Sequence, residues 1–383
     1  MKKILILCLS AKLLFSNNLE LRSYLGSEYK SYLKKANNKR SNNKAVTFQN
    51  ELKYSLDSSK LYSKIDILKD FTEKERDYFN ITEAYYLYEF TDFDFYIGKK
   101  IIFLGSLEAY NLVDIFNRQN YQKDILSDYK KGAYLTGIDY YFKDDSKLNF
   151  YIKGFEEDLN FASEKSPYYA FGNLKYKKKP LFSNRNETFS FLTTYSKTYD
   201  ENTVADISYG LFYGYDNYIL FKKIANKYRS FLFQSTKLFT YNTFVIDSFL
   251  FKIEGSFTKI KDDKEVRLDD FYELGFGLEY TIEKIIKNHN LGLIAEYYKS
   301  NTELTNMNND LFLALRYSLN DADSSEILGG IIKDFENNEI STYVKYEGRL
   351  TDNLKISTDL RYINSNSYLN EHLRFSCELK YYF

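Results

Sequence analysis

Residues 373–383 read Leu-Arg-Phe-Ser-Cys-Glu-Leu-Lys-Tyr-Tyr-Phe, and apolar and polar side chains alternate along this stretch up to the terminal phenylalanine. Successive side chains of a β-strand point to opposite faces. One face therefore carries Leu373, Phe375, Cys377, Leu379, Tyr381 and Phe383, and the other carries Arg374, Ser376, Glu378 and Lys380. Because an apolar face suits lipid and a polar face suits water, the pattern is typical of a strand in a transmembrane β-barrel.

The same alternation recurs along the chain, most clearly over residues 205–215, 271–282, 311–319 and 354–362. A soluble β-sandwich has the same period, with its apolar face turned into a core. The barrel is favoured by the secretion signal described below, by the terminal phenylalanine and by the lack of any helical segment. We predict an all-β protein, a transmembrane antiparallel barrel of about 18 strands (a range of roughly 16–20).

Connections between the predicted strands alternate in length. Short turns are predicted at 57–59, 91–92, 143–146 and 351–353, and longer polar loops at 34–43, 71–80, 156–185 and 302–309. Tight turns on one side and longer loops on the other are typical of outer-membrane barrels. Two stretches fit this scheme less directly: 168–177 reads as strand or loop, and the lysine-rich 218–227 is interpreted as a loop.

Composition excludes several classes of protein. The chain has 39 Tyr, 32 Phe and 2 Pro with a mean hydropathy of −0.49, so it is aromatic yet polar. It contains no run of 18 apolar residues, which a membrane-spanning helix would need. The 53 basic and 53 acidic side chains cancel, so no global field indicates a nucleic-acid partner.

The first residues resemble a secretion signal, because two lysines precede a short apolar stretch. We therefore predict a cleaved signal peptide at 1–17, a single barrel domain at 18–383, and a location in the outer membrane, in contact with its lipid. Cys377 is then the one cysteine left in the exported chain, so no disulfide framework is expected.

The stretch 104–130 is the longest predicted connection and the third external loop. It carries apolar residues such as Leu112, Val113 and Phe116, which would be costly on an external tip. We predict that this loop folds into the barrel and narrows it. Its acidic residues would then face basic ones across a constriction formed by Glu108, Asp114, Arg118, Lys123, Asp124, Asp128, Lys100 and Lys131. The spacing of Asp114 and Arg118 equally fits a local ion pair on a helical turn.

Strand parity predicts which charged residues face the lumen wall: Arg316, Lys345, Glu347, Arg349, Lys355, Asp359, Arg361, Arg374, Glu378 and Lys380. Each of these side chains could equally do no more than solvate the wall. Lys99 falls on the apolar face, where a lysine at mid-membrane costs about 2–4 kcal/mol, so we expect a bulge or an interfacial depth there.

The sequence carries little that indicates an enzyme. Its two histidines, His289 and His372, lie in predicted connections and lack the partners of a catalytic triad. No Cys/His spacing of a metal site and no glycine-rich phosphate loop is present. We expect no enzymatic activity, no metal and no cofactor.

Two motifs resemble those of Gram-negative outer-membrane porin-like proteins. Gly98-Lys-Lys-Ile-Ile-Phe-Leu-Gly105 precedes a loop bearing Asn111-Leu-Val-Asp114 and residues 117–121, although the family's tryptophan before the second glycine is replaced. The resemblance covers about 35 residues. It implies a passive channel for small hydrophilic solutes, with Phe383 as the signal read by the barrel-assembly machinery. A structural or adhesive barrel with an occluded lumen is the alternative, and monomer and homotrimer both fit.

Overall fold

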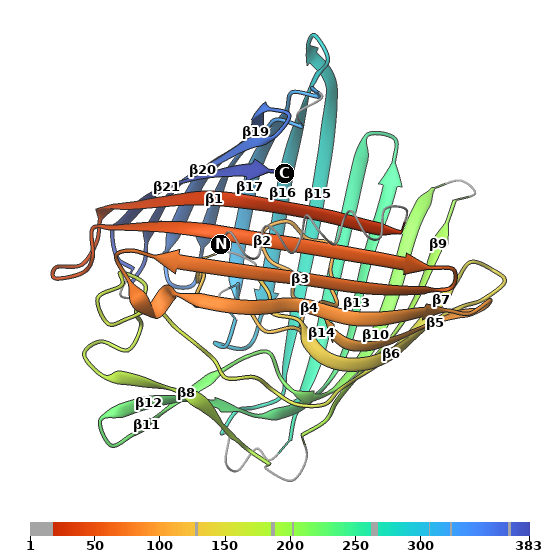
Figure 1. Ribbon diagram of the computed structural model, residues 1–383, viewed down its shortest axis with the longest axis horizontal. Coiled ribbons are helices and arrows are strands. Elements are labelled where there is room, and N and C mark those ends of the chain that lie inside the picture. Colours follow the sequence, from red (N-terminus) through yellow and green to blue (C-terminus); the bar gives the residue numbers. More distant parts are fainter. Residues whose placement is uncertain are drawn as a thin grey trace.

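The computed structural model describes residues 18–126, 129–184, 188–200, 203–261, 267–305, 307–321, 324–366 and 369–383. The predicted signal peptide and Asp128 lie outside these residues. Within them, each barrel strand pairs antiparallel with the next along the chain, and β21 pairs with β1. The sheet closes into a barrel of 18 strands (Figure 1). The predicted fold class and strand number are confirmed.

The first half of the barrel wall consists of β1 (Leu19–Lys34), β2 (Asn42–Leu56), β3 (Ser59–Asp70), β4 (Tyr78–Glu89), β5 (Phe93–Lys100), β6 (Ala133–Tyr141), β7 (Lys147–Lys153), β9 (Ser190–Tyr199) and β10 (Val204–Tyr215). The second half consists of β13 (Gln234–Ile246), β14 (Phe249–Ile260), β15 (Phe271–Ile286), β16 (His289–Ser300), β17 (Asn309–Ser318), β18 (Glu326–Asp334), β19 (Ile340–Thr351), β20 (Leu354–Asn364) and β21 (His372–Tyr382).

A second, smaller sheet lies outside the wall. It consists of β8 (Lys175–Phe182), β11 (Leu220–Ile224) and β12 (Lys227–Leu232), with β12 in the middle. Figure 1 shows it projecting from the barrel at lower left. Interpreting 218–227 as a plain loop was therefore wrong, because β11 lies within it and β12 begins at its last residue. The sequence pattern missed them because they are short, and their register is set by β8 from a different connection.

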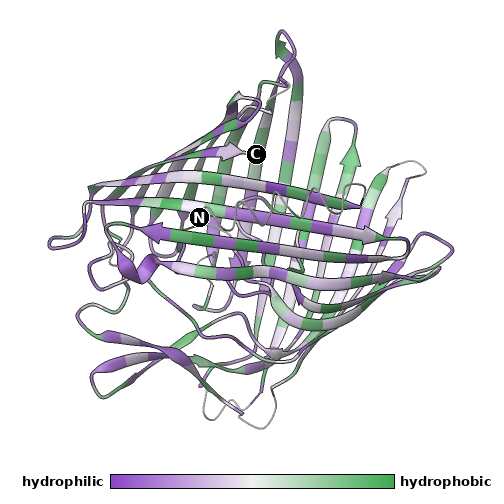
Figure 2. Ribbon diagram, viewed as in Figure 1, coloured by the Kyte–Doolittle hydropathy of each residue, from purple (hydrophilic) through white to green (hydrophobic). Residues whose placement is uncertain are grey.

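The two faces of the wall follow the predicted alternation. On β14, Phe251 and Phe257 point outward and are exposed, whereas Glu254 and Thr258 point inward and are fully buried. On β21 the outward side chains include Leu379, which is 38% exposed. Figure 2 shows the same mixture of apolar and polar bands along the strands. The outer band is thus apolar and the inner wall polar, as lipid and water require.

Connections at one end of the barrel are tight. Residues 57–58, 247–248 and 287–288 each join two strands directly, and Asp57, Asp247 and Lys287 adopt positive φ values of 32°, 53° and 56°. Positive φ matches the twist of a two-residue hairpin, and aspartate tolerates it well. The longest connections, such as 101–132 and 216–233, lie at the opposite end, which we term the long-loop end.

Helix is nearly absent from the described residues, where one short 3-10 turn spans Lys74–Arg76. No helix in this described part is long and apolar enough to cross a membrane.

Candidate channel constriction

Loop 3, defined here as residues 101–132, is the third connection at the long-loop end. It leaves β5 and returns to β6, yet its residues bond to inward-facing side chains of β14, β16, β17 and β21. These strands lie far around the wall from β5 and β6. The loop reaches them by crossing the interior of the barrel.

An apolar contact fixes one side of loop 3. Val113 and Phe116 are 0% and 1% exposed, and they belong to a cluster with Phe212 of β10 and Phe312 of β17. The apolar loop residues noted in the sequence therefore pack on the inner wall. Burying a side chain of this size stabilises the loop position by roughly 1.5–3 kcal/mol.

Two buried carboxylates hold the backbone of loop 3. Glu254 of β14 accepts hydrogen bonds from the N–H groups of Leu107 and Leu112, at 3.1 and 2.7 Å, and it also accepts one from Ser106. Glu296 of β16 accepts from two further loop N–H groups, those of Glu108 and Ala109, at 2.7 and 2.9 Å. Bonds to an ionised acceptor are about twice as strong as neutral ones. These carboxylates were not among the predicted site residues.

The signal that could have identified them is weak. Both lie on the polar face of an alternating strand, where an acid normally only solvates the wall. Nothing in the local sequence indicates that the N–H groups of loop 3 bond to these carboxylates. The loop lies about 150 residues before Glu254 and about 190 residues before Glu296.

The turn at the start of loop 3 depends on glycine. Gly105 has a φ of +126°, and a Cβ atom there would collide with the side chain of Asn111. Asn117 closes the base of the loop, since its Oδ1 accepts from Ile102 N at 2.7 Å and its Nδ2 donates to Lys131 O at 2.9 Å. The motifs Gly98–Gly105 and Asn111–Asp114 therefore shape the loop backbone.

The other side of loop 3 is held by ion pairs. The Asp124 carboxylate lies 2.9 Å from Lys30 Nζ and 2.8 Å from Arg374 Nη1, and all three side chains are buried. Burial alone would raise the pKa of Asp124, but Arg374 and Lys30 hold it well below the usual range. Arg76 adds a bond to Lys123 O at 3.0 Å. Loop 3 is thus fixed to opposite parts of the wall.

Asp114 and Arg118 do not pair with each other. Asp114 contacts Lys130, and Arg118 Nε lies 2.9 Å from a carboxylate oxygen of Glu156. Lys153 contacts the second oxygen of Glu156 at 2.5 Å. The alternative of a local ion pair between Asp114 and Arg118 on a helical turn is therefore wrong, because each side chain meets a partner elsewhere in the fold.

The remaining predicted basic residues are spread along the loop. Lys100 lies over the rings of Tyr85 and Tyr96 at 4.7 and 4.9 Å, and Lys123 lies 3.6 Å from the ring centre of Tyr129. Burial lowers the pKa of Lys131 and of Lys123. Lys123 thus lies beside Asp124 on the far part of the loop, whereas Lys100 and Lys131 lie at its base.

Lys99, which the sequence placed on the apolar face, is buried and has an ion-pair partner. It is 4% exposed, with its Nζ 2.8 Å from the Glu157 carboxylate and 4.9 Å from the ring centre of Tyr134. It is the penultimate residue of β5, at the long-loop end. The lysine therefore lies at the depth of the membrane interface and has an ion-pair partner, and it is not exposed to lipid at mid-membrane.

One group of charged side chains that retain solvent contact lies where loop 3 meets β17–β20. Arg316 lies 2.6 Å from both Glu108 of the loop and Glu279 of β15. Arg361 and Lys345 lie over Tyr343 at 5.0 and 5.1 Å. The side chains of Glu108, Arg316 and Arg361 are 29%, 22% and 15% exposed, unlike the buried pairs described above.

Most other predicted wall residues form pairs along the inner face. Lys355 contacts Glu347, Lys380 lies 3.1 Å from Glu378, and Arg374 lies 2.7 Å from Asp359. Arg349 lies over the ring of Tyr382 at 5.6 Å. The pairing leaves the wall charged yet locally balanced. As channel-lining residues these stay predictions.

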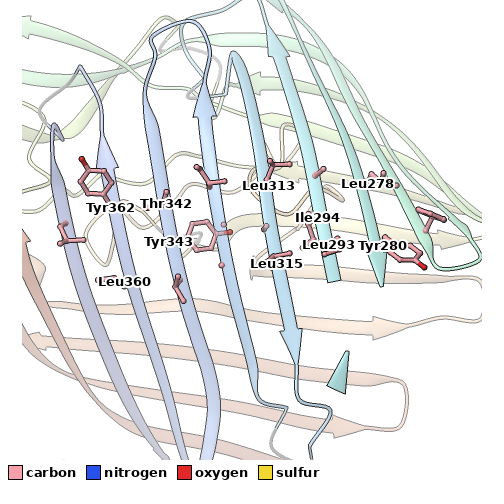
Figure 3. A pocket seen from close by; sticks show the side chains of 18 residues that line it. Leu278, Tyr280, Leu293, Ile294, Leu313, Leu315, Thr342, Tyr343, Leu360 and Tyr362 are labelled. Atoms are coloured by element: carbon pink, nitrogen blue, oxygen red, sulfur yellow. The ribbon is translucent and has the colours of Figure 1, made fainter. Parts of the chain in front are cut away.

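Two hollows differ in their position. One, of about 370 Å³, lies over loop 3 and is lined by Tyr110, Asn111, Phe171 and Phe221 among others, so it forms a vestibule at the long-loop end. The other, of about 850 Å³, is lined by Leu293, Leu313, Leu315 and neighbouring residues of β14–β21 (Figure 3). Its leucines point away from the lumen, so it belongs to the lipid-facing surface.

A closed antiparallel barrel with an apolar outer band and a charged wall crossed by a loop is the fold of outer-membrane porins. Solved porin structures match the chain over nearly its full length. They include a BenF-like porin from Pseudomonas fluorescens (8% identity, 96% of this chain and 99% of that chain, TM-score 0.60) and OccAB4 from Acinetobacter baumannii (10%, 96% and 98%, 0.59). OccK2 of Pseudomonas aeruginosa, solved with glucuronate, matches at 8% identity, 96% of each chain and a TM-score of 0.58.

No protein-family model and no curated protein sequence matches the chain. At 8–10% identity the structural similarity establishes the fold, and the porin-like barrel predicted from the sequence is confirmed at that level.

Proposed function

We propose that the chain is an outer-membrane porin, a water-filled channel through which small hydrophilic solutes diffuse passively. The single observation that carries this proposal is a long loop held inside a closed barrel, with partly exposed charges where it meets the wall. A wall of mixed charge suits hydrated solutes rather than an apolar ligand.

The constriction in this proposal has two groups of residues. Glu108, Arg316, Lys345 and Arg361 face water and set the field that a solute meets. Asp114, Arg118, Lys123 and Asp124 are 7–9% exposed, and they act on the channel by fixing the loop.

An occluded barrel with a structural or adhesive role is the second candidate. It is supported by the fixing of loop 3 to the wall on both sides, through Glu254 and through Asp124. Such a loop has little freedom to open.

Planar-bilayer recording separates the two functions. Refolded protein is added to one side of the membrane, and current is recorded in symmetric KCl. Stepwise, ohmic current increments support the porin. A silent bilayer, with a correctly folded barrel verified by its heat-modifiable mobility in gel electrophoresis, would support the occluded barrel.

Ion selectivity tests the residues. Removing the carboxylate in Glu108→Gln is expected to shift the reversal potential toward anion preference, and Arg361→Gln toward cation preference, because each removes one charge of the field. Lys143→Gln, in an exposed turn at the other end, is the matched control. Equal reversal potentials in all four proteins would remove both residues from the constriction.

No histidine supports an enzymatic reading. His289 Nδ1 lies 2.6 Å from the Tyr317 hydroxyl at the short-turn end, and His372 packs beside Tyr32 and Tyr168 at the long-loop end. Among the described residues, no three metal-ligating side chains come together.

The assembly role of Phe383 also belongs to this proposal. Its ring is 53% exposed on the lipid-facing side, and its N–H bonds to Ser23 O at 3.0 Å. Phe383→Ala is expected to lower the yield of barrel inserted in vivo while leaving single-channel conductance unchanged, and Phe383→Tyr should restore the yield. Normal insertion of the alanine variant would contradict this role.

A further inference from the structure

The small sheet outside the barrel is strongly basic. Its strands carry eight basic and no acidic side chains: four lysines on β8, two on β11, and one lysine and one arginine on β12. The whole chain has no net charge, so this concentration is local. Figure 2 shows the sheet as largely hydrophilic in colour.

Strand register gathers five of these side chains on one face. Lys175 of β8 is opposite Lys227 of β12, and Lys177 is opposite Arg229, which is in turn opposite Lys222 of β11. Directly opposed residues share a face, and like charges in that position destabilise a sheet. We term this surface the basic face. No carboxylate on these three strands offsets the repulsion between the basic side chains.

The opposite face of the same sheet is aromatic and turned toward the vestibule. Tyr176 and Tyr228 pack against Phe171, with ring centres 5.1 and 5.3 Å apart, and Tyr176 also meets Phe161 at 4.7 Å. Phe161, Phe171 and Phe221 line the vestibule. Phe231, at one end of the basic face, packs on Ile260 and Phe271 at the barrel rim, and the charged part of the face is exposed on the side of the sheet opposite the vestibule.

A carboxylate acts on the aromatic face of this sheet. Burial is the main cause that raises the pKa of Tyr176 to about 12, and the carboxylate of Asp158 contributes to it. Lys175, Lys177 and Lys227 form no ion pair with a carboxylate in the described part of the chain. Their ammonium groups are exposed to solvent.

The chemistry of the basic face selects phosphate rather than a nucleobase. The aromatic residue of this face, Phe231, is 3% exposed and lies beneath Lys222, whose Nζ is 3.3 Å from the ring centre. Proteins that bind single-stranded nucleic acid combine positive charge with exposed stacking rings, which this face lacks. Charges spaced about 5 Å across strands and about 7 Å along them suit a ligand with several phosphate groups.

We propose that the basic face binds the phosphate groups of the lipopolysaccharide around the barrel. This inference rests on the proposed outer-membrane location, because that glycolipid is the phosphate-rich component of the leaflet at the long-loop end. The basic face is a lateral contact, separate from the solute path.

The test uses the full-length refolded barrel in detergent and purified rough lipopolysaccharide as the probe. The variant Lys175→Gln/Lys177→Gln/Lys227→Gln removes three charges, and Lys143→Gln/Lys284→Gln/Lys287→Gln removes three exposed lysines at the short-turn end as the control. Each basic contact with an anionic leaflet contributes about 1 kcal/mol. We therefore expect binding about a hundredfold weaker in the first variant and unchanged in the control.

A second arm identifies the chemistry and the source. The same lipopolysaccharide, dephosphorylated with hydrogen fluoride, should fail to bind the unaltered barrel, and duplex DNA and heparin should compete poorly. Equal binding of the dephosphorylated glycolipid, equal loss in both triple variants, or stronger binding of DNA or heparin would overturn the proposal. Bilayer conductance of the same preparations is measured separately. A barrel that carries no current but binds lipopolysaccharide through these lysines would refute the proposed porin function and leave the proposed lipopolysaccharide site standing.

Discussion

The guanidinium of Arg374 lies 2.8 Å from the carboxylate of Asp124, a residue 250 positions earlier in the chain. The last strand of the barrel thereby holds the far side of loop 3. Arg374 was predicted as a wall residue and Asp124 as a constriction residue, and the contact between them gives both one structural role. The position of the loop depends on this contact and on the two carboxylates across the barrel.

Removing the Asp124 charge should release loop 3 on this side. In Asp124→Asn, Lys30 and Arg374 each lose one buried counter-charge and keep only Glu28 and Asp359, so we expect a loss of stability of up to about 3 kcal/mol. We expect a lower urea midpoint for unfolding from detergent or lipid and a noisier open-channel current. Asp352→Asn, at an exposed turn, should change neither measurement. An unchanged midpoint in Asp124→Asn would show that the pair does not fix the loop.

The pH dependence follows from the lowered pKa of Asp124. A carboxyl whose pKa is depressed on folding contributes stability above its unfolded pKa of about 4, and that stability is lost only as pH falls through the lower folded value. We therefore expect open-channel noise to stay constant from neutral pH down to about pH 4. A rise in noise between pH 6 and 5 would contradict this assignment.

The carboxylates of Glu254 and Glu296 should control backbone protection in loop 3. Glu254→Gln keeps one acceptor oxygen but turns an amide NH₂ toward the loop N–H groups. We expect amide hydrogen exchange in residues 106–113 to speed up about tenfold or more, since charge-assisted bonds contribute about 1.5–3 kcal/mol. Glu283→Gln, exposed near the β15–β16 turn, is the control. Equal exchange in both variants would refute the anchoring role.

The glycine at position 105 provides a sharp comparison. Gly105→Ala combines a φ of +126° with a collision against Asn111, whereas nothing lies within 4 Å of the position that a Cβ would take at Gly154. We expect Gly105→Ala to lower stability by about 1–3 kcal/mol and Gly154→Ala to be neutral. Urea unfolding monitored by tyrosine fluorescence measures both. Equal midpoints would show that the loop turn adapts without strain.

The sequence by itself determined the architecture. Period-two alternation, as in residues 373–383 and 271–282, decides which side chains meet lipid, and the alternation of short and long connections fixes the antiparallel order. These signals are local, because the membrane acts on each strand separately. The apolar residues of loop 3 also identified it as the connection that enters the lumen.

Only the tertiary structure decided which charged side chains form ion pairs with each other. Asp114 meets Lys130, Arg118 meets Glu156, and Asp124 meets Arg374, although the sequence grouped Asp114, Arg118 and Asp124 into one constriction with other partners. It also assembled β8, β11 and β12 into a basic sheet from two different connections. The physical reason is that an ion pair or a strand register between distant segments depends on where closure of the barrel brings their backbones, which no local pattern encodes.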